Sequence, residues 1–278
     1  MTPPHRPRNA AAWDRLAREG SGFAQVATDA KLADPRAALD TRGWLPADLT
    51  GRSVLCLGAG GGWQSILYAA LGCRVTVLDL SREMLRQDER EAARRGFRDR
   101  ITAVEADMAE LPTTLPGAPF DLVHQPVSSC YVPDLPGLYE AVAALTTPGG
   151  LYIGQHKQPA SLQTLGPLPD GGYRVGLDYD RRTNGRNARL PDPDPHTARL
   201  GLREAGCVEY LHTWTDLVGS LCRAGFVLED LSEPHHADRT APAASAGHRA
   251  RFLPPYVRLK ARRVASAGAA GPKILVPG

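Results

Sequence analysis

The sequence predicts an α/β fold in which a mostly parallel, seven-stranded sheet carries helices on both faces. Two observations lead to this prediction. Short apolar runs alternate with helical patterns, over residues 53–155 and again over 213–261. A glycine-rich turn follows directly after the first of these runs, at residues 58–62. Strands that alternate with helices form right-handed crossovers, so the pattern indicates a doubly wound sheet.

The expected strands are apolar runs bounded by glycine or polar residues, and they cover 53–57, 74–78, 101–105, 120–124, 151–155, 226–231 and 255–261. Helices are expected at 64–71, 81–95, 135–145 and 213–224. Ser81 is a residue type that favours the start of a helix, and Gly72, Gly96 and Gly225 stand where glycine commonly ends one. Each helix therefore connects two predicted strands.

The stretch VLCLGAGGGWQS, residues 54–65, leads from a strand through a glycine loop into a helix. Glycine permits a sharp turn and a close approach to a ligand, and the helix start offers free N–H groups. A dinucleotide site would place its third glycine at position 63, which is tryptophan here. Gly58, Gly60 and Gly62 instead form a GxGxG pattern, which is characteristic of methyltransferases that depend on S-adenosylmethionine.

Two carboxylates follow the next two strands. Asp79 ends the second strand, where a carboxylate accepts hydrogen bonds from both hydroxyls of a ribose. Asp107 follows the third strand, where it would accept from an adenine amine while the backbone of Met108 faces the ring. Because the carboxyl ends of parallel strands meet at one edge of a sheet, we expect these residues and the glycine loop to converge.

On these residues the chain resembles the class I S-adenosylmethionine-dependent methyltransferases, over 51–159 and again over 210–263. The segment FDLVHQPVSSCYVPDLPGLYEAVAALTTPGGLYIG is similar to the family's fourth strand, the following helix and the fifth strand. The chain looks closest to a bacterial group with a GGGxQS loop and an HPVSN-like segment, matched here at 60–65 and 125–129.

The resemblance implies S-adenosyl-L-methionine as cofactor, with Trp13 in the N-terminal helix closing over its methionine end. The implied cofactor-binding residues are Trp13, Gly58, Gly60, Gly62, Gln64, Asp79, Leu80, Asp107, Met108 and Gln125. One departure is Cys56, which stands where the family often has an acid, two residues before the first glycine. We interpret Cys56 as a small buried hydrophobic residue and expect another group, or water, to replace the acid.

The expected organisation has five segments. They are an N-terminal helical cap (1–45), a cofactor-binding Rossmann-like core (46–159), an inserted lid or substrate segment (160–206), the completion of the core (207–263) and a flexible tail (264–278). Within the cap, residues 1–9 are rich in Pro and Arg and are expected to be disordered, and a helix is expected from residue 9 to about residue 19.

Two residues are candidates for a general base, which is needed only if the nucleophile arrives protonated. His156 follows the fifth strand, and Tyr131 lies in the loop after the fourth. We interpret His124 as facing the core and His212 as facing the inserted segment. No metal is expected, because the loop after the fourth strand has no clustered carboxylates or amides.

Composition limits the partners. The net charge is only +3. The sequence does not suggest the concentrated basic face that a nucleic-acid binder needs. The N-terminus has no apolar signal segment, and no apolar run approaches the roughly 18 residues of a membrane helix. The five cysteines lack the close spacing of a metal or redox pair. We expect a cytoplasmic protein that binds a small molecule, neither nucleic acid nor membrane, and a homodimer is left open.

The predicted function is methyl transfer from S-adenosylmethionine to an oxygen, nitrogen, carbon or sulfur nucleophile of a small molecule, in specialised natural-product biosynthesis. Two alternatives stay open at this point. An enzyme of the same fold could bind the same cofactor and catalyse a rearrangement or cyclisation. An NAD-dependent oxidoreductase is the second alternative, and Trp63 in the glycine loop disfavours it.

Overall fold

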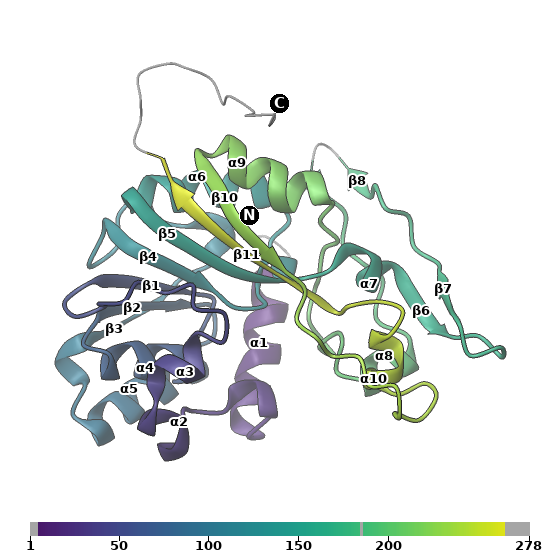
Figure 1. The fold of residues 1–278 in the computed structure, drawn as a ribbon, viewed down its shortest axis with the longest axis horizontal. Coiled ribbons are helices and arrows are strands. Elements are labelled where there is room, and N and C mark those ends of the chain that lie inside the picture. Colours follow the sequence, from purple (N-terminus) through teal and green to yellow (C-terminus); the bar gives the residue numbers. More distant parts are fainter. Residues whose placement is uncertain (1–4, 184–185, 265–278) are drawn as a thin grey trace.

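The computed structural model describes residues 5–183 and 186–264. Seven strands form one sheet in the order β10-β11-β5-β4-β1-β2-β3 (Figure 1). Neighbouring strands from β5 to β3 are parallel, whereas β11 is antiparallel to both β5 and β10. The bounds are β1 Ser53–Leu57, β2 Arg74–Asp79, β3 Ile101–Glu105, β4 Phe120–Gln125, β5 Thr146–Lys157, β10 Phe226–Ser232 and β11 Tyr256–Arg263. The predicted fold class is confirmed.

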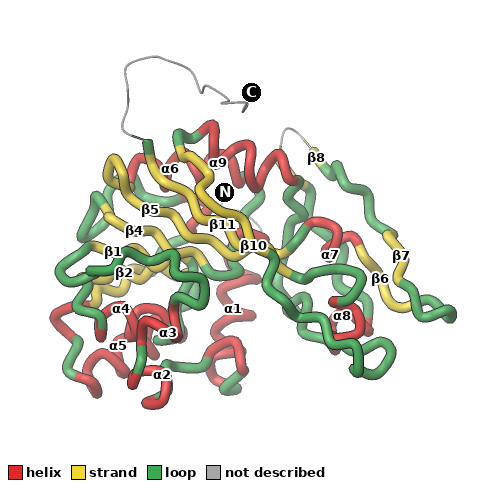
Figure 2. Tube along the Cα trace, in the orientation of Figure 1, coloured by secondary structure: helices red, strands yellow, loops and turns green. Residues whose placement is uncertain are grey.

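Helices cover both faces of this sheet (Figure 2). On one face lie α4 (Gln64–Ala70) and α5 (Arg82–Arg95), with the short helices α2 (Asp29–Ala33) and α3 (Pro35–Leu39) beside α4. On the other face lie α6 (Leu135–Leu145) and α9 (Ser220–Arg223), which a π-helical turn, η5 (Thr215–Gly219), precedes. The remaining turns are η1 Gly22–Ala24, η2 Arg98–Arg100, η3 Met108–Glu110 and η4 Ser129–Tyr131.

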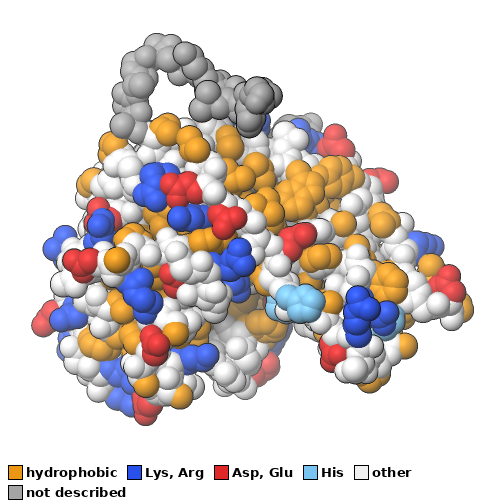
Figure 3. All heavy atoms as spheres, in the orientation of Figure 1, with side chains coloured by type: hydrophobic (Ala, Val, Ile, Leu, Met, Phe, Trp, Pro, Cys, Tyr) orange, Lys and Arg blue, Asp and Glu red, His pale blue; other side chains and the backbone are white. Residues whose placement is uncertain are grey.

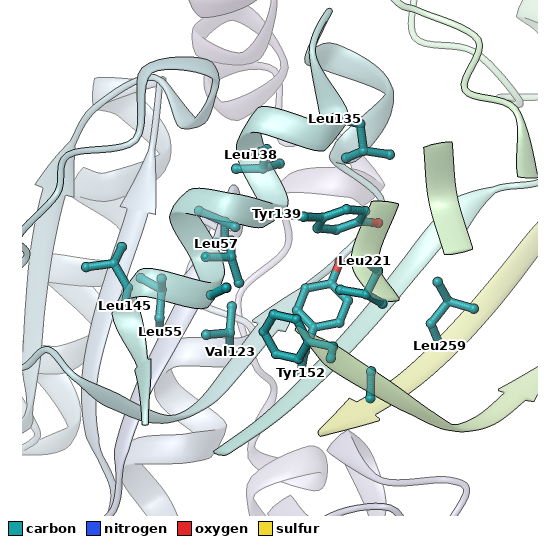
Figure 4. Packing of buried hydrophobic residues seen from close by; sticks show 14 of the residues in the cluster. Leu55, Leu57, Val123, Leu135, Leu138, Tyr139, Leu145, Tyr152, Leu221 and Leu259 are labelled. Carbon is teal, nitrogen blue, oxygen red and sulfur yellow. The ribbon is translucent and has the colours of Figure 1, made fainter. Parts of the chain in front are cut away.

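Apolar side chains on alternate strand positions form a separate core on each face. Leu55, Leu57 and Val123 pack beneath α6, where Tyr139 and Tyr152 meet edge to face (Figure 4). Val54 and Cys56 face the opposite way and pack against Tyr68 of α4 and its neighbours. Cys56 is fully buried, as the sequence interpretation expected. Burial on both faces fixes the register, because a slip by one residue would exchange the two cores.

The N-terminal segment differs from the prediction of disorder for residues 1–9. Helix α1 begins at His5 and ends at Arg18. Asn9 is buried, and its side chain donates to the carbonyl of Val208 (3.1 Å) and accepts from its N–H (2.6 Å). This pairing gives the first turns a tertiary partner that composition does not reveal. Residues 1–4 lie outside the described part of the chain.

Two segments without a recognisable motif, 160–206 and 232–254, pack against each other as one lobe beside the sheet (Figure 1). The buried guanidinium of Arg249 donates to Ser161 Oγ (2.8 Å) and to the Ser161 carbonyl (2.7 Å). The elements of these segments are α7 Pro159–Gln163, β6 Thr164–Pro167, β7 Tyr173–Val175, β8 Arg182–Thr183, β9 Arg186–Asn187, α8 Pro195–Arg199 and α10 Ala246–Ala250. Figure 3 shows a notch in the surface between this lobe and the core.

Apart from Val264, whose N–H donates to the carbonyl of Gly225 (3.0 Å), the predicted tail lies outside the described residues. In the described part of the chain, none of the helices has both the length and the apolar character that crossing a membrane requires.

Candidate functional site

A cavity of about 610 Å³ opens at the carboxyl ends of the parallel strands and extends under the N-terminal segment. This volume lies within the usual range for small-molecule sites. The predicted site residues on its wall are Trp13, Gly58, Gly60, Gln64, Asp79, Leu80, Asp107, Met108 and Tyr131. The fold therefore brings the glycine loop and both strand-end carboxylates to one place.

The glycine loop needs its glycines because side chains of α5, of the last residue of β2 and of the loop after β4 lie very close to its backbone. Gly58 has φ +60°, and a Cβ there would lie 2.9 Å from the Cβ of Ser128. A Cβ on Gly60 would lie 2.8 Å from the Cβ of Met84 and 3.1 Å from that of Asp79. A side chain at either position would displace the loop, so the close packing preserves open backbone on the cavity wall.

Backbone hydrogen bonds hold the carboxylate of Asp79 in place. Its Oδ2 accepts the N–H of Gly60 and its Oδ1 the N–H of Ser81, both at 2.9 Å. Burial raises the pKa of Asp79, and these backbone bonds oppose the increase. The group is thus both oriented and tied to the glycine loop at the end of β2.

At the end of β3, Asp107 meets α1. Its Oδ1 accepts the N–H of Ala109 (2.9 Å), and its Oδ2 lies 3.2 Å from Nε2 of His5. Burial opposes ionisation, but His5 and the Ala109 N–H together lower the pKa of Asp107. Both Oδ2 and His5 Nε2 are buried without a well-directed hydrogen bond, as is Gln64 Oε1 on the same wall. Buried polar atoms rarely stay unpaired, so these three atoms suit a polar ligand.

A buried acid that sequence reasoning missed, Asp88 of α5, supports the glycine loop from behind. Its Oδ2 accepts the N–H of Gly61 (2.8 Å), and its Oδ1 accepts from the hydroxyl of Ser65. Burial raises the pKa of Asp88 to about 7. The amphipathic pattern of α5 would have placed this acid on the buried face, which was the available signal.

Three of the predicted site residues are not on the cavity wall. Gly62 faces the N-terminal segment, and its carbonyl accepts the N–H of Ala27 (3.0 Å). Gln125 is fully buried and accepts from the hydroxyl of Tyr152 (2.7 Å). His156 is also fully buried; its Nδ1 lies 2.8 Å from Ser129 Oγ.

Successive side chains of a strand point to opposite faces of the sheet, and this alternation explains where the histidines lie. Gln125 and His156 face the α6 side of the sheet, whereas His124 faces the α4 side and lines the cavity. Tyr68 OH lies 2.7 Å from His124 Nδ1. Burial lowers the pKa of His124 to about 4 and that of His156 to about 3, so both rings are neutral near pH 7. The interpretation of His124 as facing only the core was incomplete, since its ring reaches the cavity.

Tyr131 is held by a buried ionic cluster. Its hydroxyl donates to Glu204 (2.7 Å), which also accepts from Lys157 (2.6 Å). Lys157 also pairs with Glu209, and Glu209 with Arg203. Burial and the nearby Glu204 raise the pKa of Tyr131, so it stays a neutral phenol. Glu204 is the only residue of the inserted segment on the cavity wall, within the described residues.

The part of the cavity away from Gly58, Gly60, Asp79 and Asp107 is built differently. Its walls come from the N-terminal segment, the residue that precedes α4, β5 and β11, and they include Leu39, Thr41, Arg42, Trp44, Trp63, Ile153, Gln155, Tyr256 and Arg258. Arg258 donates to Gln155 Oε1 (2.6 Å) and Thr41 Oγ1 (3.0 Å). We refer to this part as the acceptor half, and to the wall around residues 58–60, 79 and 107 as the cofactor half, after the roles that we propose for them below.

His212 is buried below the inserted segment, where its Nδ1 lies 2.8 Å from the side-chain nitrogen of Asn187. Over residues 5–183 and 186–264, no three His, Cys, Asp or Glu side chains are grouped in a way that would hold a metal ion.

Comparisons with known proteins agree with this geometry. Residues 54–150 match the family model described as a methyltransferase domain. The uncharacterized methyltransferase YbaJ of Bacillus subtilis is 33% identical over 237 residues, which cover 81% of this chain and 89% of YbaJ. The ubiquinone biosynthesis O-methyltransferase of Paracidovorax citrulli is 36% identical over 194 residues, 61% of this chain and 79% of that protein.

Solved structures show the same fold. An S-adenosylmethionine-dependent methyltransferase from Mesorhizobium loti superposes with a TM-score of 0.63 at 24% identity, over 84% of this chain and 100% of that one. Geranyl diphosphate C-methyltransferase from Streptomyces coelicolor superposes with a TM-score of 0.60 at 15% identity, over 95% and 100% of the two chains.

The fold and these comparisons thus define an enzyme with a Rossmann-like core and a cavity at the carboxyl ends of its parallel strands. More specifically, the chain belongs to the class I S-adenosylmethionine-dependent methyltransferases, and its cofactor is S-adenosylmethionine.

Proposed function

We propose that this methyltransferase transfers its methyl group to an oxygen, nitrogen, carbon or sulfur nucleophile of a small molecule, in specialised biosynthesis. The supporting observation is that one cavity joins the cofactor half to an acceptor half lined by aromatic side chains. A volume of about 610 Å³ suits a cofactor and a small acceptor better than a segment of a macromolecule. The cytoplasm as location, and the absence of nucleic-acid and membrane partners, belong to the same proposal.

The residues of the cofactor half suit the parts of S-adenosylmethionine. Asp79 would hold the ribose hydroxyls, because its carboxylate is fixed by two backbone N–H groups. Asp107 would accept from the adenine amine through Oδ2, which is buried without a well-directed partner. The open backbone at Gly58 and Gly60 permits a close approach. Bound there, the cofactor supplies an electrophilic methyl group.

Tyr131 would orient the acceptor, since it lies on the cavity wall and its own proton is directed to Glu204. A nucleophile that carries a proton could then donate to the phenol oxygen. The edge-to-face contact of Tyr131 with Trp13, at 5.8 Å between ring centres, restricts the ring position. His156 has no place on the wall, so we assign it a supporting role through Ser129.

The experiment is to incubate the purified protein with S-adenosylmethionine and a panel of small phenols, amines, thiols and carbon nucleophiles. Production of S-adenosylhomocysteine together with a product heavier by one methyl group would support methyl transfer. Conversion of an acceptor without S-adenosylhomocysteine would instead indicate a rearrangement or cyclisation on the same cofactor. The Asp79→Ala variant serves as the control with an impaired cofactor half.

A further inference from the structure

We propose that the acceptor carries an oxyanion, a carboxylate or a phosphate, which Arg258 binds in the acceptor half. This inference rests on the proposed function, because it concerns the second ligand of the same cavity.

Each acid on the wall already has a partner. Both oxygens of Asp40 accept backbone N–H groups, from Trp44 (2.7 Å) and Leu45 (2.8 Å). Asp79 and Asp107 belong to the cofactor half, and Glu204 is paired with Lys157. In the acceptor half, both oxygens of Asp40 are thus occupied by backbone N–H groups and neither bonds to a guanidinium in the described structure.

Within the described residues, Arg258 forms no direct ion pair with an acid. Among the described residues, its hydrogen bonds go to neutral oxygens, those of Gln155 and Thr41. These bonds use Nε and Nη1, and no bond from Nη2 is formed within the described structure. Burial and the nearby Arg42 lower the pKa of the Arg258 guanidinium, so its positive charge is held at a cost. An oxyanion accepting from Nη2 would remove this cost and form a charge-assisted bond.

Arg42 adds a second positive charge at the same end. Its guanidinium lies over the ring of Trp44, 5.9 Å from the ring centre, and 3.8 Å from a carboxylate oxygen of Asp230. Half of its side chain is exposed, so it would attract an anion without enclosing it. Arg42 therefore brings a second guanidinium to this end of the cavity, where it also faces the carboxylate of Asp230.

The rest of the acceptor half is apolar and aromatic, with Trp44, Trp63, Tyr256 and Ile153 on its wall. Arg258 pairs in register with Gln155, and the neighbouring Gly154 pairs with Gln125 at the end of β4. The lining of the acceptor half thus suits an acceptor with an apolar or aromatic body and an oxyanion beside Arg258.

The test measures binding without turnover, so it stays separate from the test of methyl transfer. The protein is saturated with S-adenosylhomocysteine and titrated by calorimetry with benzoate, phenyl phosphate and the neutral benzyl alcohol. We expect one or both anions to bind at least about tenfold more tightly than benzyl alcohol. The stronger of the two identifies a carboxylate or a phosphate as the natural group.

Variants locate the effect. Arg258→Gln should weaken anion binding by about tenfold or more and leave benzyl alcohol unaffected, and Arg258→Lys should fall between. Arg262→Gln is the matched control, because it removes the same charge from the same strand at an exposed site paired with Glu229. If Arg258→Gln does not fold, Arg42→Gln should still weaken anion binding severalfold. Equal binding of anions and benzyl alcohol, or unchanged anion binding in the folded variants, would overturn the proposal whether or not methyl transfer is found.

Discussion

The two halves of the cavity are built on different principles. The cofactor half uses residues at the ends of adjacent parallel strands, and backbone N–H groups fix its carboxylates. The acceptor half uses side chains from segments far apart in sequence, such as Thr41 and Arg258, which are 217 positions apart and bond to each other. The order of the strands thus determines where the residues of the cofactor half lie. The acceptor half depends instead on which side chains occur at particular positions. With the proposed roles, we expect that acceptor specificity can change while cofactor binding is retained.

The largest effect is expected at the buried ionic cluster of Lys157, Glu204 and Glu209, which holds Tyr131. Glu204→Gln keeps the side-chain shape but leaves Lys157 and Arg203 to share Glu209. Removing one partner of a buried ion pair costs about 3 to 5 kcal/mol, so the free energy of unfolding measured in urea should fall by about that amount. Glu233→Gln, which changes an exposed acid, is the control. A loss below about 1 kcal/mol would show that the cluster does not stabilise the fold.

Asp79→Ala should separate the two halves. The variant loses the carboxylate that would hold the ribose, and affinity for S-adenosylmethionine should drop by about a hundredfold, measured by calorimetry. Benzoate or phenyl phosphate should still bind to the acceptor half. Asp99→Ala, at an exposed position outside the cavity, should leave cofactor affinity unchanged. Cofactor affinity within threefold of wild type in Asp79→Ala would contradict the assigned role.

Asp88 gives the cofactor half a dependence on pH. Its folded pKa of about 7 lies above the ordinary value of 3.8, so between these values the folded state binds more protons than the unfolded state. Stability from this group is therefore lost as the pH rises, by about 2 kcal/mol between about pH 5 and pH 7. Asp88→Asn should lack this decline. Chemical unfolding at several pH values tests it, and parallel pH profiles for the two proteins would be the contrary result.

The smallest effect concerns Tyr131. Once an acceptor is found, Tyr131→Phe should lower kcat/KM by about tenfold while cofactor affinity stays the same, because one oriented hydroxyl is lost. His156→Gln should retain kcat within about twofold, since His156 is not on the cavity wall. If His156→Gln folds and lowers kcat more than Tyr131→Phe does, His156 and not Tyr131 would be the better candidate for the base.

Local pattern was sufficient to predict most of the core. The strand at 53–57 and the helix at 135–145 have the predicted bounds. The strand predicted at 151–155 extends over 146–157 instead, because Thr146 pairs with Phe120 and Lys157 pairs with Tyr256. Pairing with a neighbour lengthens a strand beyond its own apolar run, and a single segment carries no sign of that.

The site was less predictable at positions where the face of the sheet determines whether a side chain reaches the cavity. The choice between His124 and His156 depends on which face each strand position takes, and neighbouring positions point to opposite faces. The acceptor half was not predicted at all, because Arg258 lies in an ordinary alternating strand and Thr41 in a short turn. Similarly, the order of residues 5–9 depends on Asn9 meeting Val208, a contact between distant segments.

The bond between Arg258 and Thr41 has a consequence for synthesis of the chain. The ribosome delivers residues 53–125, with the glycine loop and both strand-end carboxylates, long before β11 emerges. A nascent chain can thus assemble the edge with the glycine loop first, and only the arrival of β11 completes the wall that we propose to select the acceptor.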